Sequence, residues 1–395
     1  MSTVNIHAVV QTEILEASYA WLCIQRNKAH HNNSVWDFRF KKDQYLPALQ
    51  QSLLDGTYRF SPLKSHTING NRLSSWNAAD LLVLKAISLA LQPLITQTHA
   101  PHSAHLKNAG GVHGALQQVV AHQSHYQQIL KTDVKDYYAS INHDILLSLC
   151  RTYIDCEILL NLIRQYCERL EIRDGHYFHF AQGIPKGCPL SPLMGTLYLK
   201  PLDDALSRKG FYIRFMDDWI VMVKTKHQLR KIIKLTHKIL EKLKLKMHPD
   251  KTFFGCIKKG FDFLGIHFGE QPEISKTSLE KHRERIDRRY AQGASAACIG
   301  SYIERWTSWC KGMLACCEGV SRLGCSIESS NNHRGNPLIY GDIKNAQYNT
   351  RQDKTREMYA GRANVTLASS TPRDLYGTST KRRSQDQTQL GRIMQ

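Results

Sequence analysis

Apolar residues recur at helical spacing along much of the chain, and short apolar runs bounded by turn residues lie between these segments. Spacings of three and four residues predict helices, whereas short bounded runs are typical of strands. The expected helices are residues 13–29, 43–55, 78–91, 143–154, 156–170, 191–209, 226–246, 276–290 and 299–315. The expected strands are residues 58–62, 65–72, 129–134, 211–215 and 219–223, with turns at 69–70 and 173–175 and a further hairpin over 252–268. This mixture favours an α+β fold.

Residues with special backbone behaviour set several of these boundaries. Pro93 is expected to stop the helix that begins at residue 78, since a proline disfavours helical backbone before it. Ser191 and Pro192 open the next long helix as N-cap and first helical residue, and Gly210 ends it. From about Leu323 the chain becomes rich in Asn, Gln, Ser, Thr and Arg without periodicity, which indicates a disordered tail.

The length of 395 residues, with 42% hydrophobic and 22% charged residues, predicts a folded protein of several domains. No run of eighteen apolar residues and no secretion signal is present, so a cytoplasmic protein without membrane contact is expected. The eleven cysteines form no Cys-x-x-Cys pair, which favours reduced thiols over a zinc site. For the histidines His99, His102 and His105, a solvated loop is favoured over metal binding.

The charge of +19 predicts a polyanionic partner. Residues 208–289 hold 21 Lys or Arg and 10 Asp or Glu, a net charge of +11, so this part of the chain is expected to face phosphates. Nucleic acid is the favoured partner, although ribosome-associated and membrane-surface proteins can be equally basic.

Three acidic residues stand at the ends of apolar strands. Asp133 follows residues 129–132, and Asp217 and Asp218 lie between the strands expected at 211–215 and 219–223. Acids in apolar strands need a compensating charge. If the strands pair, the carboxylates can hold two magnesium ions, which activate a hydroxyl and stabilise a leaving pyrophosphate. An isolated Asp-Asp pair is more often a solvated turn, so the interpretation depends on the strands and on the other motifs.

Five motifs, in order along the chain, resemble those of a reverse transcriptase. Residues 133–144 resemble the first catalytic block, residues 183–193 the second, and residues 215–218 the Tyr-x-Asp-Asp signature. Residues 248–252 resemble the segment with a lysine near the triphosphate, and residues 261–265 the primer grip. The matching motif residues are Gly183, Pro185, Gly187, Ser191 and Pro192 in the second block, Phe215 and Met216 in the signature, and Leu264 and Gly265 in the grip. The resemblance covers roughly residues 45–315.

The resemblance implies roles for individual residues. Asp133, Asp217 and Asp218 would be the catalytic acids and metal ligands, with the carbonyl of Val134 completing one shell around two Mg²⁺ ions, for which Mn²⁺ can substitute. Four residues would contact the nucleotide: Tyr138 as a steric gate against a ribose 2′-hydroxyl, Lys251 near the triphosphate, and Arg72 and Lys186 on or near the incoming nucleotide. The alternatives are a core aromatic role for Tyr138 and an ordinary turn position for Lys251.

Two positions depart from the family pattern. Lys186 stands where most members carry Gln, so nucleotide affinity or fidelity is expected to be unusual, and Phe215 replaces the signature Tyr. Neither departure removes a metal ligand, so activity is expected. Residues 143–147 and 288–311 resemble the bacterial group II intron-like branch, whereas the Ser191-Pro192 pair argues against the diversity-generating branch. The tail lacks the paired cysteines of a zinc endonuclease.

The resemblance implies a right-hand polymerase with an antiparallel palm. Its expected parts are an N-terminal helical extension (1–44), fingers (45–125), palm (126–270), helical thumb (271–322) and polar tail (323–395). The leading function is RNA-directed DNA synthesis, with an RNA template, a DNA or RNA primer and deoxynucleoside triphosphates as partners. The alternatives are a maturase or chaperone that binds a structured intron or other non-coding RNA, and a polymerase used in antiviral defence.

Overall fold

The computed structural model describes residues 3–68, 71–99 and 102–323 of the chain. The chain divides into two compact units, residues 1–326 and 327–395, and the described residues all belong to the first. The turn expected at residues 69–70 and all but the first residue of the expected tail lie outside them. Helices are mixed with three sheets whose pairing is antiparallel except between β1 and β4, so the α+β fold class is confirmed. The predicted division into fingers, palm and thumb stays a prediction.

The helix α5 (Ala78–His99) is the central helix of the amino-terminal half. It contacts α1 (Ile6–Val9), α2 (Thr12–Gln25) and α3 (Ser34–Phe40), and α4 (Lys42–Leu54) packs on α1 and α3. By length and composition α5 alone, among the described helices, could cross a membrane, but 61% of its most apolar window is buried inside the protein. Its apolar surface is therefore covered largely by the protein itself.

The predicted end of this helix before Pro93 is wrong, because α5 continues through Pro93 to His99. A proline inside a helix removes one backbone hydrogen bond. Ile95 and His99, which follow Pro93, are 0% and 2% exposed, so the packing of this last part compensates for the lost bond.

A four-stranded sheet with the order β2-β1-β4-β5 combines two hairpins distant in sequence. They are β1 (Leu63–Ile68) with β2 (Asn71–Ser75), and β4 (Leu170–Arg173) with β5 (His176–His179). The strand expected from residue 58 is wrong, since Tyr58 instead donates a hydrogen bond to the buried Asp80 at 2.6 Å. The helix expected over 156–170 ends earlier, because α9 (Glu157–Cys167) gives way to β4.

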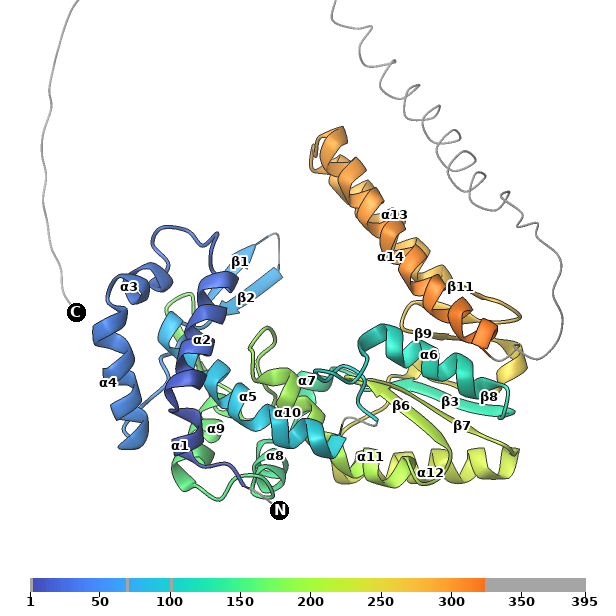
Figure 1. Ribbon diagram of the computed structural model, residues 1–395, viewed down its shortest axis with the longest axis horizontal. Helices are drawn as coiled ribbons and strands as arrows, with labels where there is room; N and C mark the ends of the chain where they lie inside the picture. Colours follow the sequence, from blue (N-terminus) through green and yellow to red (C-terminus); the bar gives the residue numbers. More distant parts are fainter. Residues whose placement is uncertain (1–2, 69–70, 100–101, 324–395) are drawn as a thin grey trace, which may run out of the picture. The chain divides into compact units, whose positions relative to one another are not determined.

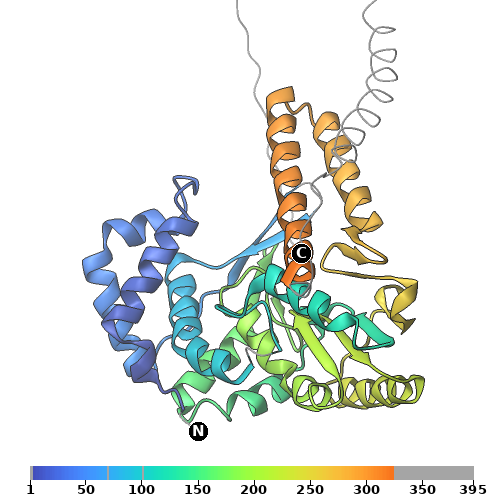
Figure 2. The same cartoon turned by 45° about the vertical axis from the view of Figure 1, so that its right-hand side comes forward.

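The central sheet has the order β6-β7-β3-β8 and is antiparallel throughout. Its strands are β6 (Phe211–Phe215), β7 (Asp218–Val223), β3 (Gln128–Asp133) and β8 (Phe253–Cys256). One face packs against α6 (Gly111–Gln123) through Ile129 and Met222, and the other packs against α12 (Lys226–Lys242) through Leu130 and Val221 (Figures 1 and 2). The alternation of the strands thus separates two cores.

The hairpin expected over 252–268 is wrong, because its two halves belong to different sheets. β8 pairs with β3, whereas β9 (Phe261–Phe263) pairs with β10 (Ile266–Phe268), which pairs with β11 (Pro272–Ile274). The 3-10 turn η2 (Ile257–Lys259) and Gly260, at φ +78°, redirect the chain between the sheets. The antiparallel helices α13 (Lys276–Ala291) and α14 (Ala296–Leu323) follow, close to their expected positions (Figure 2).

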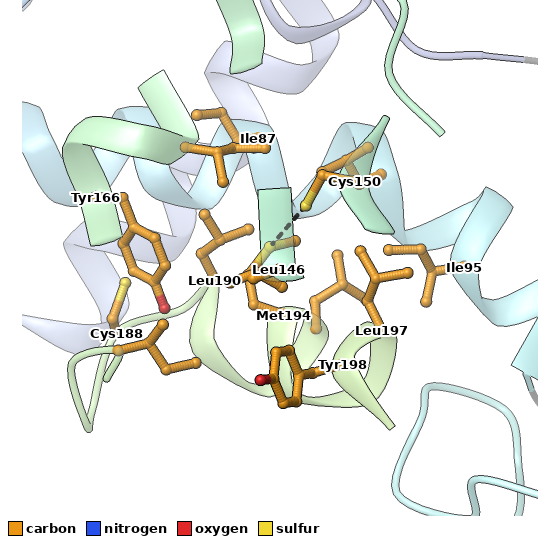
Figure 3. Close-up of a cluster of buried hydrophobic side chains, with 14 of the residues drawn as sticks. Ile87, Ile95, Leu146, Cys150, Tyr166, Cys188, Leu190, Met194, Leu197 and Tyr198 are labelled. Carbon is orange, nitrogen blue, oxygen red and sulfur yellow. Dashed lines mark hydrogen bonds between the residues drawn. The ribbon is translucent and has the colours of Figure 1, made fainter. Parts of the chain in front are cut away.

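The helix expected over 191–209 is two helices, α10 (Ser191–Tyr198) and α11 (Lys200–Leu206), which meet at Leu199. The predicted N-cap role of Ser191 is wrong, because Leu190 is the N-cap and Ser191 is the first helical residue. α10 is buried on every side but packs most closely on α8 (His143–Cys150) and α5. Figure 3 shows Met194, Leu197 and Tyr198 of α10 among residues from these helices, with the thiol of Cys150 hydrogen-bonded to the sulfur of Met194 at 3.9 Å. The loop before α10 is thereby anchored to the core.

Candidate active site

Strand pairing brings the three predicted acids together. Asp133 ends β3 and lies directly opposite Asp218, the first residue of β7, while Asp217 occupies the turn between β6 and β7. Met216 in this turn has φ +56°, a left-handed conformation that is unusual for a residue with a side chain. Because side chains alternate along a strand, Asp133 and Asp218 point to the same face of the sheet as Ile129 and Met222.

Burial and neighbouring charges raise the pKa values of two of the acids. Burial, followed by the nearby carboxylate of Asp133, raises the pKa of Asp217 to about 6. Burial raises the pKa of Asp218 to about 7, and the charges of Asp133 and Asp217 add to this effect while Lys131 opposes it. One carboxylate oxygen each of Asp133 and Asp218, Oδ1, is buried without a hydrogen-bond partner. Gathering these acids therefore destabilises their charged forms.

Lys251 supplies a cation to this acidic cluster. Its Nζ lies 2.5 Å from Oδ2 of Asp133, and hydrogen bonding to this carboxylate raises the pKa of the lysine. The backbone places it there: the N–H of His248 donates to the carbonyl of Asp133 at 2.8 Å, and the turn η1 (Pro249–Lys251) follows. Val134, which is 2% exposed, lies between these bonded segments in a bridge with Met247. Lys251 thus contacts a predicted metal ligand directly.

The donor set suits a divalent cation that prefers oxygen. Carboxylate oxygens are the ligands of Mg²⁺, and the two unpartnered Oδ1 atoms of Asp133 and Asp218 have no hydrogen bond to lose. Among the described residues, however, no group of three or more His, Cys, Asp or Glu is arranged to hold a metal ion. The residues fit a metal by their chemistry, and binding requires the Lys251 ammonium to leave Oδ2 of Asp133.

The second predicted motif forms a loop pinned against the first. The N–H groups of Gly183 and Ile184 donate to the carbonyls of Ile141 and Tyr138, each at 2.8 Å. At Gly183, φ is +83° and a Cβ atom would lie 2.8 Å from the carbonyl oxygen of Ala139, so only glycine fits. The hydroxyl of Ser191 donates to the carbonyl of Pro185 at 2.5 Å, which closes the loop at the start of α10.

The predicted nucleotide contacts are brought together only in part. Tyr138 packs beside Tyr137, with ring centroids 5.5 Å apart, and burial, followed by the charge of Asp217, raises its pKa to about 12. Lys186 is exposed in the glycine loop, next to Gly187. Arg72 lies in β2 opposite Thr67, and its side chain is outside the described part of the structure. Leu264 and Gly265 form the tip of the β9–β10 hairpin, in a different sheet from the acids.

A buried ion pair beneath the sheet holds the acidic turn, and sequence reasoning missed it. The guanidinium of Arg214, 0% exposed, donates to both oxygens of Asp203 at 2.8 and 2.5 Å and to the carbonyl of Met216 at 2.7 Å. Tyr212 also donates to Asp203, at 2.6 Å. Burial disfavours both charges, but Arg214 and its neighbours hold the pKa of Asp203 well below its usual range. An Arg inside an apolar strand was the available sequence signal.

His105 holds the other side of the same turn. The backbone N–H of Met216 donates to Nδ1 of His105 at 2.9 Å, and Nε2 contacts the hydroxyl of Thr196 at 2.7 Å. That hydroxyl donates to the carbonyl of Pro192, so the ring carries its proton on Nε2. Burial lowers the pKa of His105 to about 3 and keeps the ring neutral. The solvated loop expected for the histidines is wrong here: His105 is half-buried, and His99 is buried within α5.

Comparison with known proteins identifies the family to which this arrangement of strands and acids belongs. The model of the family "Reverse transcriptase (RNA-dependent DNA polymerase)" matches residues 67–268, just over half of the chain. The chain therefore belongs to the reverse transcriptase family, and it is similar to group II intron-encoded proteins.

Two relatives illustrate the extent of the similarity. Protein YkfC of Escherichia coli (strain K12) is 23% identical over 291 residues, which cover 60% of this chain and 76% of YkfC. The group II intron-encoded protein LtrA of Lactococcus lactis subsp. cremoris is 23% identical over 167 residues, which cover 41% of this chain and only 28% of LtrA. A chain of a solved partial Cas6-RT-Cas1–Cas2 complex is 19% identical with a TM-score of 0.38, and the match covers 60% of this chain and 41% of that one.

Replacing Arg214 by Met should destabilise the protein strongly. The substitution leaves the Asp203 carboxylate buried without its cation, so we expect the free energy of unfolding to fall by about 3–5 kcal/mol. Lys200→Met is the matched control, since it breaks the exposed pair with Asp204 and should cost at most about 1 kcal/mol. Urea unfolding followed by circular dichroism measures both, and equal losses would contradict the role of the buried pair.

Replacing Asp218 by Asn should stabilise the metal-free protein at high pH. Because folding raises the pKa of Asp218 from 3.8 to about 7, the carboxylate becomes increasingly destabilising as pH rises through this interval. In EDTA at pH 8 the variant should gain about 1–3 kcal/mol, and the gain should vanish towards pH 4. The measurement is urea unfolding across pH. Asp204→Asn, at an exposed carboxylate, should show no such gain, and an Asp218→Asn variant less stable than the native protein at pH 8 would refute the interpretation.

Proposed function

We propose that this protein is an RNA-directed DNA polymerase that adds deoxynucleotides to a primer 3′-hydroxyl. The observation that carries the proposal is the pairing of Asp133 with Asp218, with Asp217 in the adjoining turn. Membership of the reverse transcriptase family supports the same reaction. The substrates would be an RNA template, a DNA or RNA primer and deoxynucleoside triphosphates.

The acids would hold two divalent ions, Mg²⁺ with Mn²⁺ as a substitute, through Asp133, Asp217 and the carbonyl of Val134, with Asp218 beside them. Bound ions would activate the attacking hydroxyl and stabilise the charge on the leaving pyrophosphate. The chain's own contribution is placement: the β3–β7 register sets the separation of the acids, and Arg214 and His105 hold the turn from opposite sides. Such preorganisation supplies much of the rate enhancement in phosphoryl transfer.

Lys251 would change partners when substrate arrives. In the structure its ammonium neutralises Asp133, and its side chain is 53% exposed, so it can turn towards an incoming triphosphate. The predicted roles of Lys186 and Arg72 at the nucleotide depend on the same electrostatic attraction to phosphate. Tyr138 would exclude a ribose 2′-hydroxyl. Its ring packs beside Tyr137, and its carbonyl accepts a hydrogen bond from the N–H of Ile184 in the Gly183 loop.

A second candidate function is binding of a structured intron or other non-coding RNA as a maturase or chaperone. The net charge of +19 and the similarity to the group II intron-encoded protein LtrA favour it. RNA binding of this kind does not require the acids, so it should persist in a protein that has lost Asp217. A role in antiviral defence involves the same polymerase chemistry and is not separated from the first proposal by any described residue.

Asp217→Ala should abolish DNA synthesis. Removing this carboxylate takes away one predicted metal ligand, so extension of oligo(dT) on poly(rA) with Mg²⁺ or Mn²⁺ should fall by at least about 100-fold. The control Asp204→Asn removes an exposed carboxylate that pairs with Lys200 and should extend normally. If neither the native protein nor the variant extends the primer, and both bind structured RNA at low salt, the maturase or chaperone proposal replaces the polymerase.

Tyr138→Ala should relax the choice of sugar. Without the ring, a 2′-hydroxyl fits beside the acids, so the preference for dTTP over UTP should fall by about 10-fold or more. Tyr138→Phe keeps the ring and should keep the preference. The ratio of kcat/KM for the two nucleotides measures this, and an unchanged ratio in the alanine variant would show that Tyr138 is a packing residue.

A further inference from the structure

The outer face of α12 carries a row of cations. Its helix contains six Lys or Arg and a single acid, Glu241, and all six cations are exposed. Five of them recur at every fourth residue: Lys226, Arg230, Lys234, Lys238 and Lys242. Each step of four residues advances about 6 Å along a helix and rotates by about 40°, so the five form a row about 24 Å long that winds almost halfway around α12.

This row is electrostatically unfavourable for the isolated protein. Like charges four residues apart destabilise a helix, and a cation such as Lys226 in the first turn opposes the helix dipole. Among the described residues, none of the six cations of α12 lies in an ion pair. In contrast, α13 intersperses its basic residues with three acids, Glu280, Glu284 and Asp287. A bound polyanion would relieve the repulsion on α12.

The row lies on the opposite side of the central sheet from the acids. Leu229, Ile232 and Leu240 of α12 pack on the face that carries Leu130 and Val221. Asp133 and Asp218 point to the other face, where α6 and the Met313 side chain of α14 pack. Figures 1 and 2 show α6 and α12 on opposite sides of the strands. A nucleic acid on α12 is therefore a different segment from the primer terminus at the acids.

The geometry points to the row on α12 as a second RNA-binding surface, which holds the phosphates of a folded RNA while the acids act on the primer. The identification of the polyanion as RNA rests on the proposed function. Evenly spaced cations suit phosphate contacts, which carry no base specificity, so duplex RNA of any sequence should bind. The amide of Gln228, which lies beside the row, already accepts hydrogen bonds from the N–H groups of Lys224 and Thr225.

A membrane fits this surface less well. A basic amphipathic helix binds lipid by burying its apolar face in the bilayer. The apolar face of α12 is already covered by the sheet: Leu229, Ile232, Ile239 and Leu240 are between 2% and 9% exposed. A membrane could therefore attract α12 only through its charge. The phosphates of an RNA backbone, in contrast, form a row that matches the row of cations.

The test replaces three cations of the row, in the variant R230Q/K234Q/K238Q. The control K28Q/K107Q/K258Q loses the same charge from exposed lysines on three separate segments. Binding of a fluorescein-labelled 30-base-pair RNA hairpin is measured by anisotropy in EDTA, without nucleotides, between 50 and 300 mM KCl. We expect the row variant to bind about 10-fold or more weakly at 100 mM KCl, with a salt slope lower by about 2–3. The control should change less than about 3-fold.

Extension of oligo(dT) on poly(rA) at saturating substrate and a thermal melt complete the experiment. The row variant should extend the primer as fast as the native protein and melt at the same temperature, because it keeps the acids and the helix. The inference would be overturned if both variants bound the hairpin equally weakly, or if the row variant bound it as tightly as the native protein. It would also be overturned if the row variant lost only binding to phosphatidylserine vesicles, or if it lost primer extension. If the native protein extends no primer but the two variants still differ in hairpin binding, the polymerase proposal fails and the α12 surface stands.

Discussion

The ion pair between Arg214 and Asp203 fixes the turn that carries Asp217, and the geometry of the acids depends on it. Arg214 lies in β6 with its side chain beneath the sheet, yet one of its nitrogens reaches the carbonyl of Met216 in the turn. His105 takes the neighbouring N–H of Met216 from another segment. A residue in a left-handed conformation is thus held by both of its backbone polar groups, which keeps the turn from relaxing.

This support offsets an electrostatic cost. Burial disfavours the charged forms of Asp217 and Asp218, and repulsion from the neighbouring carboxylates adds to their raised pKa values. The cluster persists because strand pairing fixes Asp133 opposite Asp218, and because Lys251 neutralises Asp133 from a third segment. A site under this strain is ready to accept cations, since ion binding relieves the repulsion that the fold imposes.

Local patterns in the sequence predicted the parts that depend on neighbouring residues. The β6–β7 hairpin with its acids and the helices α12, α13 and α14 follow from periodicity and turn residues. Long-range partners were not predictable in this way. Asp203 and Arg214 are 11 residues apart, and the pairing of β8 with β3 and the contact of His105 with Met216 join segments more than a hundred residues apart. Pro93 shows the same limit, since tertiary packing outweighs its local preference.

The two glycines of the second motif, Gly183 and Gly187, differ in the substitutions that they tolerate. A side chain at Gly183 would collide with the backbone of Ala139, which cannot give way without moving Tyr138. Gly187 also has a positive φ, +76°, but a Cβ there would meet nothing within 4 Å. Asn or Asp, which tolerate this conformation, can replace Gly187 at little cost. The loop therefore tolerates substitution at Gly187 but not at Gly183, although both glycines belong to the same motif.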